Sequence, residues 1–146
     1  ASAPVKTSAP STGDDYTTPS SQVQEEILLN LLNQERIAQG LSPLTLDAEL
    51  SRIARIKSAD MRDNHYFAHE SPTYGHVSDM LKTFGYSFSG VGENIAHHAT
   101  TEKAHAAFMS SDGHRRNILS SAWQEVGLGI VYDANGYVYV TQIFVR

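Results

Sequence analysis

The chain has 146 residues and a formal net charge of -5, which excludes the strongly basic surface typical of nucleic-acid-binding domains. It contains no cysteine, so disulfides, thiolate zinc sites and cysteine nucleophiles are excluded as well. No apolar run approaches the roughly 20 residues that a membrane-spanning helix needs. We therefore expect a globular, monomeric protein without a transmembrane segment.

Residues 1–20 differ in composition from the rest of the chain. Ala, Ser, Thr and Pro occupy fourteen of these twenty positions. Such a segment buries too little apolar surface to offset the entropy lost on ordering it. We therefore expect a disordered linker over residues 1–20 and a single folded domain over residues 21–146.

Four helices are predicted from apolar residues that recur every three or four positions. The first covers about residues 21–39 and ends at Gly40, and the second follows the N-cap residue Asp47 and extends to about Asp63. The third covers about residues 77–84, and the fourth begins after Thr100 or Thr101. One further helical turn is expected over residues 114–120.

The strands are predicted mainly at the end of the chain. Residues 126–132 and 137–145 flank a turn typical of a hairpin, and a shorter strand is expected around residues 92–95. Because the helices come first and the hairpin last, the sequence predicts an α+β protein with an antiparallel sheet.

Three segments place a titratable side chain beside turn-forming residues, where binding residues concentrate. These segments, residues 67–72, 92–96 and 113–119, contain the candidates His69, Glu93 and His114. If these side chains converge, two imidazoles and one carboxylate would suit a divalent ion such as Zn²⁺, with positions left open to water. The same three groups could instead form a metal-free acid/base cluster in which Glu93 orients a histidine.

Other polar residues are expected to have structural roles. His97 and His98 should lie on the surface after the short strand, and one of Arg115 and Arg116 should pair with an acid to hold its loop. The histidines at 76 and 105 should be structural or exposed. Asn94 and Asn117 are expected to bind backbone groups and so shape the site.

The segments that carry the candidates also resemble the motifs of the CAP superfamily (SCP/Tpx-1/Ag5/PR-1). The chain is most similar to the cysteine-free bacterial branch of SCP-like extracellular proteins, and the resemblance covers about residues 23–144. The matching segments, in chain order, are LLNQER at 31–36, PL at 43–44, FAHESP at 67–72, GENIA at 92–96, GHRRNIL at 113–119, VGLG at 126–129 and TQIF at 141–144.

This resemblance implies a three-layer α-β-α sandwich with a central antiparallel sheet and an open cavity. It makes His69 and His114 the cavity histidines, which are the ligands in members that bind metal, and Glu93 the first cavity carboxylate. Eukaryotic members have a second Glu where this chain has Ser111. Unless Asp112 or Glu125 replaces it, a divalent ion such as zinc or magnesium should bind more weakly.

The resemblance also implies a protein that is secreted or associated with the cell envelope. One hypothesis is a binding or interaction module for an extracellular ligand, such as a cell-wall component, a lipid or a protein. The other is a hydrolase in which His69, Glu93 and His114 are catalytic, with metal-bound water or a His/Glu pair as the base. Ser110 and Ser111 are candidate nucleophiles, but no Gly-x-Ser-x-Gly elbow surrounds them. The residues leave open whether any reaction is catalysed.

Overall fold

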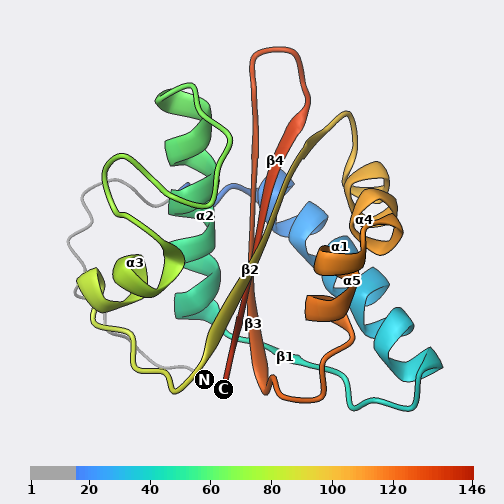
Figure 1. Ribbon diagram of the computed structural model, residues 1–146. Coiled ribbons are helices and arrows are strands. Elements are labelled where there is room, and N and C mark those ends of the chain that lie inside the picture. Colours follow the sequence, from blue (N-terminus) through green and yellow to red (C-terminus); the bar gives the residue numbers. More distant parts are fainter. Residues whose placement is uncertain (1–15) are drawn as a thin grey trace.

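The computed structural model describes residues 16–146, which form a four-stranded sheet between two layers of helices (Figure 1). Most of the expected linker, residues 1–15, lies outside the described residues. The strands are β1 (Thr45–Leu46), β2 (Val91–His98), β3 (Glu125–Tyr132) and β4 (Val138–Val145). The helices are α1 (Pro19–Ala38), α2 (Ala48–Asp63), α3 (Val77–Thr83), α4 (Thr101–Ser110) and α5 (Asp112–Ile118).

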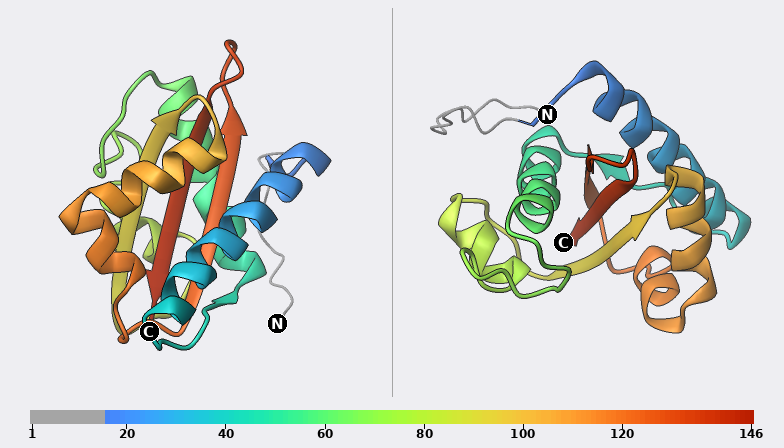
Figure 2. Two further views of the ribbon diagram at one scale, coloured as in Figure 1. Left: turned by 90° about the vertical axis from the view of Figure 1, so that its right-hand side faces the viewer. Right: turned by 90° about the horizontal axis from the view of Figure 1, so that it is seen from above.

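The layers confirm the α-β-α sandwich. Helices α2 and α3 cover one face of the sheet, and α1, α4 and α5 cover the other (Figures 1 and 2). The strand order is β1-β3-β4-β2, with β4 antiparallel to both β2 and β3. Within the described sheet, β1 is the exception because its two residues pair in parallel with β3. A two-residue strand is too short to leave a periodic signal in the sequence.

Local capping explains where the first helices begin. The Thr18 side chain accepts a hydrogen bond from the Ser21 N–H, and Pro19 occupies the first turn, so α1 begins two residues before the expected position. The side chain of Asp47 accepts a bond from the Leu50 N–H, as expected for the cap of α2.

Strand β2 is longer than expected. It extends to His98, so His97 and His98 lie within the strand rather than after it. His97 is exposed, in agreement with the surface position expected for it. Its ring stacks on Tyr139 of the neighbouring strand with centroids 3.9 Å apart, and its Nε2 lies 2.7 Å from Asp133 Oδ2. These cross-strand contacts connect residues far apart in sequence, which is why short-range patterns end the strand too early.

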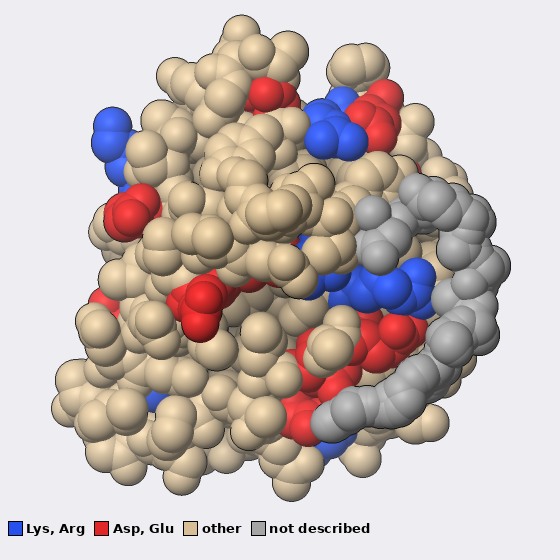
Figure 3. All heavy atoms as spheres, turned by 180° about the vertical axis from the view of Figure 1, so that it is seen from behind, with Lys and Arg blue, Asp and Glu red and all other residues tan. Residues whose placement is uncertain are grey.

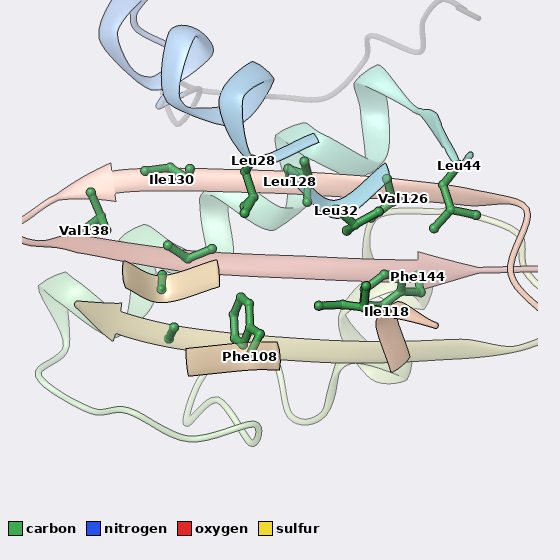
Figure 4. Packing of buried hydrophobic residues seen from close by; sticks show 13 residues of the cluster. Leu28, Leu32, Leu44, Phe108, Ile118, Val126, Leu128, Ile130, Val138 and Phe144 are labelled. Atoms are coloured by element: carbon green, nitrogen blue, oxygen red, sulfur yellow. The ribbon is translucent and has the colours of Figure 1, made fainter. Parts of the chain in front are cut away.

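The core has one apolar cluster on each face of the sheet. Figure 4 shows the cluster on the face covered by α1, α4 and α5, to which α1 contributes Leu28 and Leu32, α4 contributes Phe108, and β3 and β4 contribute further apolar side chains. The second cluster joins α2 and α3 to the opposite face, with Ile53 and Met80 among its members. Since both faces are covered, access to the sheet is left mainly at its edges.

Charge is mixed on the surface. On the face shown in Figure 3, Lys and Arg side chains lie next to Asp and Glu side chains. They form no continuous basic stripe on the part of that face that the structure describes. None of the described helices has the length and hydropathy needed to cross a membrane.

Candidate functional site

The first half of the site is a hydrogen-bonded pair between the loop after α2 and strand β2. His69 Nδ1 lies 2.8 Å from Glu93 Oε1, and the Glu93 side chain is only 3% exposed whereas that of His69 is 55% exposed. An ionised carboxylate only accepts hydrogen bonds, so Nδ1 carries the proton that is shared with Glu93. In the neutral ring, Nε2 of His69 is then the nitrogen with a free lone pair.

A buried lysine on α2 holds this loop. Lys57 is 1% exposed, and its Nζ donates a 2.8 Å hydrogen bond to the His69 carbonyl. Burial lowers the pKa of Lys57, whereas the nearby carboxylates of Glu93 and Asp60 raise it. The lysine thus places a cation beneath the site, next to the acid that orients His69. The sequence analysis missed Lys57 because a single lysine on an amphipathic helix is usually exposed to solvent.

Asp60, one turn further along α2, anchors the same loop. Its carboxylate accepts hydrogen bonds from Asn64 Nδ2 at 2.6 Å, from Ser71 Oγ at 2.6 Å and from the Tyr66 hydroxyl. Burial and then the bond to Asp60 raise the pKa of Tyr66, so the phenol stays protonated and continues to donate. Three donors on one buried carboxylate fix the path of the segment that carries His69.

The second half of the site is His114 on α5. Its Nδ1 lies 2.9 Å from Ser111 Oγ, and its ring packs 5.2 Å from the Phe108 ring, measured between centroids. Burial lowers the pKa of His114, and the positive charge of His69 lowers it further. Both imidazoles line the same cavity although the two residues are 45 positions apart in the sequence.

Two asparagines and an arginine position α5, as expected. Asn94 Nδ2 donates to the His114 carbonyl at 3.1 Å, and Asn117 Nδ2 donates to Asn94 Oδ1 at 3.0 Å. Arg115 pairs with Asp112 at 2.5 Å and donates to the Met109 carbonyl. These bonds tie α5 to strand β2 and to the end of α4, so the position of His114 is set by the sheet.

The two histidines line one cavity of about 410 Å³. Its walls come from the loop after α2, from the end of β2, from α4 and from the start of α5. The lining residues are Phe67, Ala68, His69, Ile95, Ala96, His97, His98, Ala107, Phe108, Ser111 and His114. The wall is therefore mainly apolar, and its polar groups are imidazoles and one hydroxyl.

The expected three-ligand arrangement is not formed. Glu93 lies behind His69 and bonds to its ring, and Glu93 is not part of the cavity wall. Residues 16–146 contain no group of three or more His, Asp or Glu side chains arranged to hold a metal ion. The second carboxylate position is Ser111, which bonds to His114, while Asp112 pairs with Arg115 and Glu125 lies on β3, two strands away from β2. Neither acid completes the set.

The first testable prediction concerns the pKa of the His114 imidazole. Its pKa should lie below the ordinary histidine value of about 6.5. A His69→Ala substitution should raise that pKa only in part, because burial is the larger cause. Unfolded His114 binds its proton at a higher pH than the folded form, so the contribution of this group to stability falls as the pH drops through its unfolded pKa. Imidazole NMR titration of both proteins measures the shift. A His114 pKa at or above 6.5 would contradict the burial described here.

A second prediction concerns Lys57. Replacing Lys57 with methionine should cost about 1–3 kcal/mol, because the His69 carbonyl loses its donor and Glu93 and Asp60 lose a nearby cation. Amide exchange in the 64–71 segment should become faster. Lys82→Met is the matched control, since Lys82 is exposed on α3 and its replacement should change stability by less than about 0.5 kcal/mol. Equal effects of the two substitutions would show that Lys57 does not hold the loop.

Comparison with known proteins identifies the family. Residues 29–144 match the family model described as CAP, the cysteine-rich secretory protein family. The chain is 44% identical over 137 residues to the uncharacterized protein YkwD of Bacillus subtilis (strain 168), an alignment that covers 93% of this chain and 49% of YkwD. The chain therefore spans about half the length of this relative.

Solved structures share the fold. An extracellular protein containing a SCP domain from Bacillus anthracis str. Ames is 33% identical with a TM-score of 0.78, covering 89% of this chain and 44% of that one. An outer surface protein from Borrelia burgdorferi has a TM-score of 0.79 at 15% identity, with 86% and 93% coverage, and that likeness concerns the fold alone. Because the family model covers most of the chain, including all three candidate segments, this protein belongs to the cysteine-rich secretory protein (CAP) family.

Proposed function

We propose that this chain is a binding module whose ligand enters the cavity beside His69 and His114. The observation that supports this most directly is the composition of the wall, in which apolar side chains surround four imidazoles and a hydroxyl. Ligand sites are commonly apolar clefts with a few polar groups that fix orientation. Nδ1 of His69 bonds to Glu93 and Nδ1 of His114 bonds to Ser111, which holds these two rings in fixed orientations.

The distribution of hydrogen-bond partners argues against a serine triad. A serine hydrolase needs a single histidine that contacts both the nucleophile and the orienting acid. Here the acid Glu93 bonds to His69, whereas the hydroxyl of Ser111 bonds to His114. Ser110 Oγ donates instead to the Ala106 carbonyl on its own helix. Among the described residues, the acid and the hydroxyl of such a triad therefore contact two different histidines.

A divalent ion is a second candidate ligand of this cavity. The two imidazoles would be its protein ligands, with Glu93 orienting His69 in the manner of a carboxylate–histidine pair. NaASP2, which shares the fold at 14% identity and a TM-score of 0.58, was solved with Zn²⁺. Titration with Zn²⁺ should shift the imidazole NMR signals of both His69 and His114, and Ser111→Glu should strengthen binding by supplying a carboxylate. Unchanged imidazole signals at millimolar Zn²⁺ would exclude the ion.

We further propose that the chain acts outside the cytoplasm, either secreted or associated with the cell envelope. The support comes from its relatives, which include an extracellular protein and an outer surface protein. Separating cells carrying the full-length gene into cytoplasmic, membrane, wall and medium fractions would test this. Recovery in the cytoplasmic fraction alone would contradict the proposal.

The experiment for the binding role is a fragment screen by protein-observed NMR, with a variant that fills the cavity. Fragments that bind should shift the signals of His69, His114 and Ile95. Ala107→Trp should abolish these shifts because Ala107 lines the cavity, and Ala106→Trp should preserve them because Ala106 is exposed at the preceding position of the same helix.

Two results would contradict the binding role. One is a screen in which no fragment shifts cavity signals, and the other is binding that persists unchanged in Ala107→Trp. Cleavage of peptide or ester substrates that is lost on combining His69→Ala with His114→Ala would instead establish the hydrolase.

A further inference from the structure

The hydrogen-bonding pattern of β2 shows which of its backbone groups point away from β4, toward the open edge of the sheet. Gly90 and Arg146 exchange two backbone hydrogen bonds at the start of the β2–β4 pairing. In an antiparallel pair, such doubly bonded positions recur every second residue. Even-numbered residues of β2 therefore bond to β4, whereas Glu93, Ile95 and His97 direct their N–H and C=O groups outward. The bond from Asn117 Nδ2 to the Glu93 carbonyl, at 3.4 Å, is consistent with this orientation.

On the opposite side of the sheet, β1 pairs with only the first two residues of β3, and hydrogen bonds close the rest of the β3 edge. The Leu128 N–H donates to Ser51 Oγ at 3.1 Å, and the Ile130 N–H donates to Glu25 Oε2 at 3.1 Å. Along the same edge, the Val126 carbonyl accepts from the Asp47 N–H, and the Tyr132 carbonyl accepts from Arg62. Proteins commonly block sheet edges in this way against further strand pairing.

The β2 edge lacks this protection where it borders the cavity. Among residues 16–146, no hydrogen bond reaches the outward N–H or C=O of Ile95 or His97. Ile95 is only 5% exposed, whereas His97 is exposed, and both residues line the cavity. Buried backbone groups are nearly always paired. The cavity thus contains alternating donors and acceptors that match those of another extended backbone.

We propose that the cavity binds a peptide segment in extended conformation, which adds to the sheet as a strand beside β2. One peptide residue would exchange backbone bonds with Ile95, and the residue two positions along would do so with His97. The proposal rests on the binding function proposed above and names the ligand class of that site.

The walls of the cavity specify the side chains of this peptide. The side chains of the peptide residues that pair with Ile95 and His97 would lie on the same face of the sheet as Glu93, toward Phe67 and His69. The side chain of the peptide residue between these two would lie on the opposite face, the face of Ala96, toward α4. The lining contains no Lys, Arg, Asp or Glu, so buried charges on the ligand would find no opposite charge. The complementary peptide therefore has small or apolar, uncharged side chains at these three positions.

The experiment begins with a phage-displayed library of random heptapeptides selected on the immobilised full chain. Enriched sequences are synthesised with capped ends and added to the ¹⁵N-labelled protein. Bound peptide should slow amide hydrogen exchange at Ile95 and His97 at least tenfold. Exchange at Gly92 and Ala96, which already bond to β4, should remain unchanged. The fully N-methylated form of each peptide, which has no N–H donors, should not bind.

Two substitutions at one exposed position provide the matched control. His97→Pro removes an outward N–H and places a ring on the edge, whereas Pro on an edge strand leaves the β2–β4 bonds intact. His97→Ala loses the same side chain, with its contacts to Tyr139 and Asp133, but keeps the N–H. Peptide affinity should fall at least tenfold in His97→Pro and change less than threefold in His97→Ala.

Several outcomes would overturn the proposal. They are a selection that enriches no peptide, protection absent at Ile95 and His97, equal affinity of the two His97 variants, or unimpaired binding of N-methylated peptide. Sedimentation showing a concentration-dependent dimer that His97→Pro disrupts would assign the edge to a second copy instead. If fragments bind beside His69 and His114 while no peptide does, the binding function stands and strand addition falls. If neither binds, both fall.

Discussion

Replacing Gly129 with alanine should prevent stable folding. Helix α2 crosses β3 so closely that a Cβ atom at this position would lie 2.1 Å from the Arg55 nitrogen and 2.2 Å from the Ala54 carbonyl carbon. Both atoms belong to the backbone, so no change of rotamer relieves the overlap. Overpacking by side chains alone typically costs 1–3 kcal/mol, and we expect a loss of at least about 3 kcal/mol here. Equilibrium denaturation monitored by circular dichroism measures it.

Gly113→Ala is the control for this prediction. A Cβ at Gly113 would have no heavy atom within 4 Å, and the residue needs no positive φ. Its stability should stay within about 0.5 kcal/mol of the unsubstituted protein. If Gly129→Ala were equally mild, the close contact between α2 and the sheet would be wrong. The placement of Lys57 and Asp60 beneath the site would be wrong with it.

Removing Arg55 should have the second large effect. Arg55 donates two hydrogen bonds to the buried Glu25, through Nε at 2.8 Å and Nη2 at 2.9 Å. Arg55→Met leaves Glu25 with only the Ile130 N–H as a donor among the described residues. Breaking a buried ion pair from one side typically costs 3–5 kcal/mol, and we expect a loss of about this size in denaturant unfolding.

The pH dependence of that loss identifies its cause. Burial already raises the pKa of Glu25 even though Arg55 opposes the shift, and removing Arg55 should raise it further. A carboxyl whose pKa is higher in the folded state favours folding most when it is protonated. The cost of Arg55→Met should therefore shrink as the pH falls toward the ordinary glutamate value.

A double variant provides the control. Combining Arg55→Met with Glu25→Gln removes the unpaired charge but keeps an acceptor for the Ile130 N–H, so it should be more stable than Arg55→Met alone at pH 7. A pH-independent cost, or no recovery in the double variant, would show that lost packing rather than a stranded charge explains the effect.

Local signals in the sequence predicted most of the elements. The Asp47 cap, Gly40 after the first helix and the turn at residues 133–136 marked boundaries that the structure confirms. Each of these signals acts over a few neighbouring residues, through a cap, a left-handed glycine or a hairpin turn. Strand β1 and the end of β2 depend on partners at least 40 positions away, so no local pattern could mark them.

In the candidate site, too, local sequence signals identified some features, whereas features that depend on long-range packing were missed. The neighbourhood of turn residues and the family motifs singled out His69, Glu93 and His114, and the structure brings both histidines to one cavity. The role of Glu93 stayed open between co-ligand and orienting acid, because only its burial behind His69 distinguishes the two. Lys57 and the unpaired backbone edge of β2 were missed, since both depend on how helix α2 and the sheet pack rather than on residue type.

The tautomer of His69 tests the central claim about the site most directly. A ¹⁵N-edited long-range correlation spectrum near neutral pH distinguishes a proton on Nδ1 from one on Nε2 in a neutral imidazole. We expect the Nδ1–H form, because the Glu93 carboxylate accepts a hydrogen bond from Nδ1–H with an N···O distance of 2.8 Å. In Glu93→Ala the ring should switch to the Nε2–H form or become a mixture of the two. A predominant Nε2–H form in the unsubstituted protein would contradict the orientation of His69 by Glu93 and, with it, the site described here.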